Sequence, residues 1–229
     1  MSLLIAALGL VQGPVLHRWA VAVGNNVPFM RRHAPSAGGI PTPDRVSRWR
    51  WRPMALSLLV SLVYWGMANT LGLNLVLAAH LVMASLTAML VVTDFDHFRI
   101  PNRLLYPGGT LCILLLMGAA VFEGRTMSLQ PAFLGAAGYF TLLLAVYLAA
   151  RGEGFGFGDV KLALLLGFFA GFHSLRVLAY GLFITSLLGG IPALILLAMG
   201  KSRKTAIPYG PPLIFGTWAA IIWAPYLLR

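Results

Sequence analysis

The sequence predicts an all-α, polytopic membrane protein with about eight transmembrane helices. Hydrophobic residues make up 59% of the 229 residues and charged residues only 10%, whereas soluble domains carry about 25% charged residues. The apolar residues also form stretches of roughly 20 residues, the length that crosses a hydrocarbon core about 30 Å thick. We therefore expect one integral membrane domain over residues 1–229, with a short basic loop at 24–53.

The expected spans, in chain order, cover residues 3–23, 54–72, 74–93, 104–122, 131–150, 160–173, 175–198 and 212–228. The first is the weakest, because Gln12, Pro14 and Arg18 interrupt it. It lacks a basic segment before its apolar part, so we interpret it as a retained helix and not as a signal peptide. Proline, glycine and serine in residues 31–53 predict an irregular loop, and its alternating arginines and tryptophans are typical of an anchor at the membrane surface.

The basic residues predict the orientation. The loops 24–53, 94–103, 151–159 and 199–211 fall on one face of the membrane and hold twelve of the 17 lysines and arginines. The positive-inside rule assigns this face to the cytoplasm. Topology thus accounts for the net charge of +11, and we expect no nucleic acid partner.

Two aspartates are the strongest candidates for function. Asp94 ends the third expected span, and Asp159 precedes the sixth, directly after the glycine-rich run 152–158. An ionisable residue at membrane depth is expensive and indicates a functional site. The two helices between the aspartates return the chain to the same face, so the carboxylates can meet, share one proton and activate water.

Three stretches carry a resemblance to a known family. Residues 94–102, residues 156–162 with the run Gly156-Phe157-Gly158-Asp159, and residues 207–212 resemble the signature stretches of the type IV prepilin peptidases. These are GxGD-type intramembrane aspartyl peptidases, also called prepilin leader peptidases, and the resemblance runs from about residue 54 to the C-terminus.

The resemblance implies an activity and its site. It implies an aspartic endopeptidase of the bacterial inner membrane that removes the short basic leader of type IV prepilins, or of the pseudopilins of type II secretion, at the cytoplasmic face. Its catalytic pair falls on Asp94 and Asp159, and Asp96 matches a frequent family acid that is not the main catalyst.

Other residues are candidates for substrate binding or for supporting the aspartates. Asp96 is expected to tune Asp94, or to be solvated at the helix end. Glu153 is expected to bind the basic leader, or to be solvated in its loop. Gly156 and Gly158 are expected to let the loop pack closely against a neighbour. Lys161 is expected to pair with a carboxylate or lipid phosphate, or to extend towards the headgroups.

No metal is expected. The chain has one cysteine, Cys112, which we interpret as a buried apolar residue, and histidines at 17, 33, 80, 97 and 173 without close pairs. Many family members carry a zinc-binding cysteine insertion between the first two spans. The interval 24–53 has no cysteine, so the chain resembles a short form. The cleavage step is then expected to need no cofactor, and S-adenosylmethionine is needed only if methylation of the new pilin N-terminus is retained.

Two other functions are alternatives to the peptidase. A proton-coupled transporter could also carry two membrane acids, but its halves would show internal repetition, and neither aspartate motif occurs twice. A GxGD peptidase of the presenilin or signal-peptide-peptidase kind has tyrosine before its first aspartate, whereas Thr93 precedes Asp94. The sequence leaves open which pilin is cut, the oligomeric state and whether the missing insertion is natural.

Overall fold

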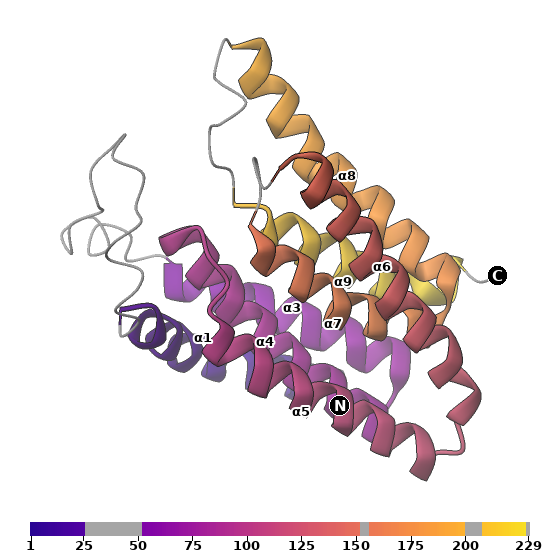
Figure 1. Ribbon diagram of the computed structural model, residues 1–229. Coiled ribbons are helices and arrows are strands. Elements are labelled where there is room, and N and C mark those ends of the chain that lie inside the picture. Colours follow the sequence, from indigo (N-terminus) through magenta and orange to yellow (C-terminus); the bar gives the residue numbers. More distant parts are fainter. Residues whose placement is uncertain (26–51, 152–155, 200–207, 228–229) are drawn as a thin grey trace.

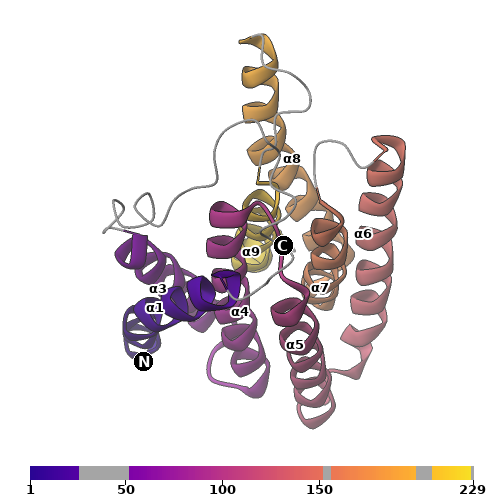
Figure 2. The same ribbon diagram turned by 60° about the vertical axis from the view of Figure 1, so that its left-hand side comes forward.

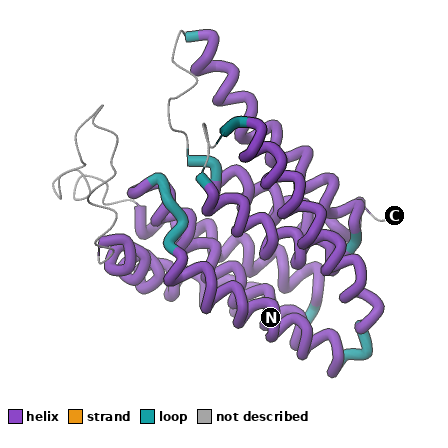
Figure 3. Tube along the Cα trace, in the orientation of Figure 1, coloured by secondary structure: helices purple, strands orange, loops and turns teal. Residues whose placement is uncertain are grey.

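The computed structural model describes residues 1–25, 52–151, 156–199 and 208–227. These residues form helices and no strand (Figure 3), which confirms the all-α prediction. The helices are α1 (Ser2–Asn25), α3 (Arg52–Leu71), α4 (Leu75–His97), α5 (Asn102–Phe122), η2 (Thr126–Ser128), α6 (Leu129–Ala149), α7 (Phe157–His173), α8 (Leu175–Ala198) and α9 (Gly210–Leu227). Each α-helix coincides with one expected span. Most of the basic loop predicted at 24–53 lies outside the described residues.

Most of the helices have the length and apolar composition of membrane spans. Within the described residues six helical segments are long and apolar enough to cross a bilayer, and they lie in α1, α3, α4, α5, α6 with η2, and α8. Large apolar side chains cover the outside of the bundle, including Leu58, Leu114, Phe122 and Phe183. An apolar surface of this kind is favourable in contact with lipid and costly in contact with water. The chain is a polytopic membrane protein.

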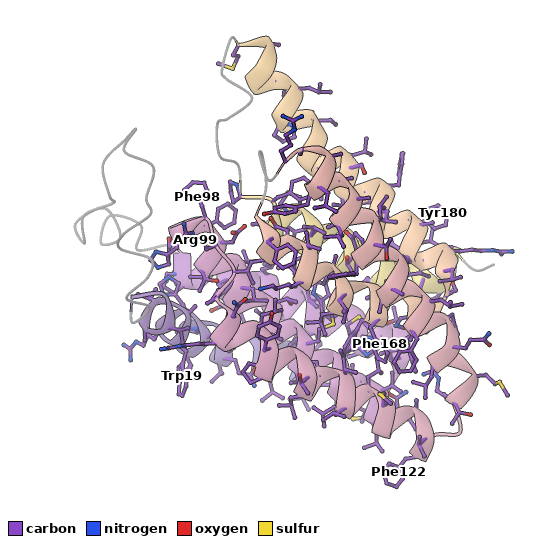
Figure 4. The ribbon with its side chains drawn as sticks, viewed as in Figure 1. Trp19, Phe98, Arg99, Phe122, Phe168 and Tyr180 are labelled. Carbon is purple, nitrogen blue, oxygen red and sulfur yellow. The ribbon has the colours of Figure 1, made fainter. Side chains whose placement is uncertain are left out.

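The bundle has two halves joined by its last helix. Figure 1 shows α1, α3, α4 and α5 on one side and α6, α7 and α8 on the other, and Figure 2 shows α9 between them. Helix α9 contacts α3 and α4 as well as α7 and α8. Among the described residues, short turns connect α3 to α4, α4 to α5 and α7 to α8. Figure 4 marks the two ends of α5, with Phe98 and Arg99 at the turn from α4 and Phe122 at the turn to η2.

Small residues let several helices approach closely. A methyl group added at Gly167 of α7 would lie only 2.4 Å from the backbone oxygen of Gly135 in α6. Likewise, a methyl group at Gly13 of α1 would lie 2.5 Å from the Cα of Ser57 in α3. Membrane helices use such small residues because lipid supplies no hydrophobic drive for association. These contacts hold α7, and therefore Asp159, in a defined place.

Candidate functional site

Asp94 lies in the last turn of α4. The span expected to end at residue 93 in fact continues as helix to His97, because a helix can carry polar residues once it reaches the membrane boundary. Phe98 closes the helix in a left-handed conformation with φ 52°, and its N–H donates to the backbone oxygen of Asp94 at 2.8 Å. The Asp94 side chain is only 4% exposed.

The start of α9 supplies a partner for Asp94. The backbone N–H of Gly210 donates to Asp94 Oδ2 at 3.1 Å. The first turn of a helix has N–H groups without intrahelical partners, but Pro211 and Pro212 have no N–H, and Leu213 N–H bonds to the oxygen of Tyr209. Gly210 is therefore the donor that this turn offers, and the positive end of the helix dipole favours a carboxylate there.

Asp159 lies in the first turn of α7. The span expected to start at residue 160 begins instead at Phe157, because Asp159 and Gly156 close the helix start by mutual hydrogen bonds. Asp159 N–H donates to the oxygen of Gly156 at 3.0 Å, and Gly156 N–H donates to Asp159 Oδ2 at 3.1 Å. Asp159 is 5% exposed, and its Oδ1 is buried without a hydrogen-bond partner among the described residues.

The two carboxylates meet at the start of α9. A methyl group added to Gly210 would lie 2.8 Å from Asp94 Oδ2 and 3.5 Å from Asp159 Oδ1. A side chain at this point would require either α9 or the Asp94 carboxylate to move. Because both carboxylates approach the same point, a negative charge on one disfavours ionisation of the other, so the pair favours sharing one proton. The structure thus brings together the two aspartates that the sequence singled out.

Two further contacts join α7 to the turn after α4. A methyl group added to Gly158 would lie 3.0 Å from Ile100 Cβ, so the glycine allows α7 to approach this turn. Lys161 Nζ donates to Asn102 Oδ1 at 3.1 Å, and its ammonium lies 5.2 Å from the Tyr106 ring and 5.0 Å from the Phe157 ring. Through Asn102, Lys161 therefore connects the second signature stretch to the first.

The remaining predicted residues lie away from the pair or outside the description. Asp96 is half-buried in the last turn of α4, and two residues turn a helix by about 200°, so its side chain leaves the opposite side from Asp94. Glu153 lies outside the described residues.

The sequence did not predict a role for Tyr209 or Gly210, although both lie in the third signature stretch, residues 207–212. Burial, and to a smaller extent the negative charge of Asp159, raise the pKa of the Tyr209 phenol, so the ring belongs to the same site. A methyl group on Gly189 of α8 would lie 2.6 Å from that ring. The sequence Gly-Pro-Pro could have indicated the role of Gly210, because the two prolines have no N–H and leave the glycine N–H as the backbone donor at the start of the helix.

His80 and His173, which are far apart in the sequence, lie side by side in the structure. Their Nε2 atoms lie 3.1 Å apart, although 93 residues separate them, because α4 and α7 are neighbours in space. No group of three or more histidine, cysteine or acidic residues that could hold a metal occurs within the described ranges. Cys112 is buried, as expected for an apolar role.

Comparisons with known proteins identify the family of this site. Residues 81–194, which include both aspartates, match the type IV leader peptidase family. The chain is 32% identical over 178 residues to a "Prepilin leader peptidase/N-methyltransferase" of Stutzerimonas stutzeri, covering 74% of this chain and 56% of that protein. A protein of the same name from Pseudomonas aeruginosa is 32% identical over 77% of this chain and 58% of its own length.

A shorter relative matches over more of its length. The Bacillus subtilis protein with the same name is 27% identical over 224 residues, covering 93% of this chain and 87% of that protein. The chain spans only 56–59% of the length of the first relatives. No solved structure matches it. Through the domain at residues 81–194, which carries Asp94 and Asp159, the chain belongs to the type IV leader peptidase family.

Proposed function

We propose that this protein is a membrane aspartyl endopeptidase that removes the short basic leader of type IV prepilins or pseudopilins. The observation that carries the proposal is the meeting of Asp94 and Asp159 at the first residue of α9. Membership of a leader peptidase family supports the reaction class. Prepilin processing is what the names of the relatives state, and we extend it to this chain.

The proposed chemistry uses both carboxylates. The ionised member of the pair takes a proton from a water molecule, and the oxygen of that water attacks the scissile carbonyl carbon. The protonated member donates its hydrogen to the carbonyl oxygen and later supports protonation of the leaving amine. Asp159 Oδ1 accepts no hydrogen bond from the described residues, which suits it to hold the water, because buried polar atoms without a protein partner are commonly bonded to water.

The proposed substrate geometry follows from where the pair lies. Both aspartates lie at helix ends, Asp94 in the last turn of α4 and Asp159 in the first turn of α7. The basic residues at this end, including Arg99 in the turn after α4 and Arg103 in the first turn of α5, support a cytoplasmic position for it. The apolar segment of a prepilin would lie in the bilayer beside the bundle, with its basic leader in the cytoplasm. The scissile bond must then lie in an unwound segment, which a leader ending in glycine supplies.

The experiment is cleavage of a purified prepilin by the purified protein, followed by mass spectrometry. Asp94→Asn and Asp159→Asn keep the volume of the side chain but cannot exchange the proton. Each should reduce cleavage to background while the protein still inserts. Asp96→Asn is the matched control, because its side chain faces away from the pair, and it should retain most activity. Near-normal cleavage by either asparagine variant would refute the proposal.

We infer that cleavage uses the carboxylates without a metal or cofactor. Methylation, which the names of the relatives include, would use S-adenosylmethionine. The two activities separate in one experiment. Cleavage should persist after chelator treatment and without S-adenosylmethionine, and a product heavier by one methyl group should appear only if the second activity is present. Loss of cleavage on chelation, restored by zinc, would contradict the inference.

A further inference from the structure

Three buried polar side chains lie on one face of α4 at intervals of seven residues. They are His80, Thr87 and Asp94, with exposed fractions of 0%, 1% and 4%. Seven residues make about two helical turns, so all three point the same way. We call them the polar stripe of α4. In a mostly apolar helix such a stripe needs partners, because a buried polar group without one is costly in a membrane.

Each member of the polar stripe is bonded to another helix. Asp94 accepts from the first residue of α9, as described above. Thr87 Oγ1 accepts from Trp218 Nε1 of α9 at 3.1 Å. His80 Nε2 lies 3.1 Å from Nε2 of His173, the last residue of α7. The stripe thus ties α4 to α9 at two levels and to α7 at the end of the bundle far from the aspartates.

The hydrogen bond between the two histidines has a defined direction. His80 Nδ1 lies 2.7 Å from the backbone oxygen of Val76. A carbonyl oxygen can only accept, so His80 Nδ1 carries the hydrogen. In the neutral ring the other nitrogen then accepts, and His173 Nε2 must be the donor. The ring of His80 also packs edge-on against Phe169 of α7, with centroids 5.0 Å apart. The hydrogen bond and the ring contact therefore both fix the orientation of the His80 ring against α7.

The spacing between histidine and aspartate is the same on both helices. Fourteen residues separate His80 from Asp94, and fourteen separate Asp159 from His173. Fourteen residues correspond to about 21 Å and nearly four complete turns, so on each helix the two side chains lie on almost the same face. Helices α4 and α7 run in opposite directions, since Asp94 is near the end of α4 and Asp159 near the start of α7. A contact between the histidines therefore sets the aspartates opposite each other.

We propose that the His80–His173 hydrogen bond sets the axial register of α4 against α7, so that Asp94 and Asp159 meet. Few direct contacts between α4 and α7 define this register, because α9 lies against both helices. A slide of one residue would move a carboxylate by about 1.5 Å along the axis and turn it by about 100°. Misplacement of about 1 Å can reduce a reaction rate about 100-fold. His80 and His173 are thus positioning residues for the active site, about 21 Å away.

Register can be measured without any substrate. Asn102 and Lys161 bond across the α5–α7 contact beside the aspartates. In a protein whose only native cysteine is replaced (Cys112→Ala), cysteines at positions 102 and 161 can be joined by a short bis-methanethiosulfonate reagent. The rate of crosslinking reports whether the start of α7 lies opposite the turn after α4. It decides the register proposal even if no leader peptide is cleaved, whereas any effect on cleavage rests on the proposed function.

We expect His80→Leu and His173→Leu to slow crosslinking. Both variants should also lower kcat for leader cleavage about three- to tenfold, with little change in KM. This is the size of effect expected from the loss of one hydrogen bond between membrane helices. His80→Gln should restore both, because its side-chain oxygen can accept from His173 Nε2. If the leucine variants do not insert, His80→Asn, whose amide is too short to reach His173, takes their place.

Tyr64→Phe is the matched control. The Tyr64 hydroxyl bonds to Gln12 at 2.8 Å and to Ser85 of α4 at 2.7 Å, so its loss removes a part-buried hydrogen bond that does not involve α7. It should lower thermal stability but leave crosslinking and kcat unchanged. Wild-type crosslinking in the leucine variants would overturn the proposal. So would an equal loss in Tyr64→Phe, since the effect would then be general loosening of the bundle.

Discussion

Adding one methyl group at Gly210 tests the centre of the site. In Gly210→Ala the new carbon would lie 2.8 Å from Asp94 Oδ2, closer than real contacts allow, and 3.5 Å from Asp159 Oδ1. Either α9 must withdraw or the Asp94 carboxylate must rotate. Both movements lengthen the 3.1 Å hydrogen bond from Gly210 N–H and change the relation between the two carboxylates.

The size of the effect follows from that hydrogen bond. A hydrogen bond to a charged group contributes about 1.5–3 kcal/mol, and each 1.36 kcal/mol corresponds to a tenfold change in rate. If the bond is needed in the transition state, kcat should fall about 10- to 150-fold. KM should change little, because the surface that would bind the apolar segment of the substrate is not altered.

The assay is initial-rate cleavage of a purified prepilin in detergent, with thermal unfolding measured in parallel. Gly118→Ala and Gly138→Ala are controls, since a methyl group at either position would meet no atom within 4 Å. Both should keep wild-type kcat. A Gly210→Ala protein with wild-type kcat would show that the α9 N-terminus does not control the carboxylate pair, and our account of the site would be wrong.

Three further variants test the surrounding contacts. Gly158→Ala should destabilise the α7 start by about 1–3 kcal/mol, the usual cost of overpacking, whereas Gly156→Ala, whose nearest contact is 3.8 Å, should be tolerated; equal unfolding temperatures for the two would contradict the packing argument. Lys161→Met, which loses the bond to Asn102 and the contacts with two rings, should lower kcat about two- to fivefold, and an unchanged kcat would limit Lys161 to interaction with headgroups. Gly167→Ala would place a carbon 2.4 Å from a backbone oxygen of α6, so the protein should lose its monodisperse elution on size exclusion, and normal elution and melting would count against close α6–α7 packing.

Composition and hydropathy were sufficient to predict the helices. Apolar stretches must be helical in lipid, since every backbone polar group needs a partner within the segment. The helix ends were less accurate, because hydropathy stops where polarity begins, whereas α4 continues through Asp94 and Asp96 and α7 starts before Asp159. These ends are fixed by backbone hydrogen bonds, which hydropathy does not record.

The aspartates could be predicted because ionisable residues are rare in spans, but their contacts could not. The bond from Gly210 to Asp94 joins residues 116 positions apart, and the contact between His80 and His173 depends on which helices are neighbours. A lone histidine in a span is ambiguous from sequence. The seven-residue spacing of His80, Thr87 and Asp94 was nevertheless visible, and it is the pattern that would have indicated a bonded face.

The short length of α7 has a consequence for the surrounding lipid. Its 17 residues extend about 25 Å, less than the roughly 30 Å of an average hydrocarbon core. Because Asp159 is in the first turn and most of α7 is buried among the other helices, those helices meet the bilayer while the carboxylate stays recessed, and water must penetrate to reach it. Membrane thickness then becomes a variable of the reaction. Liposomes of longer acyl chains would move the aspartates away from bulk water and slow hydrolysis, although no atom of the protein had been changed.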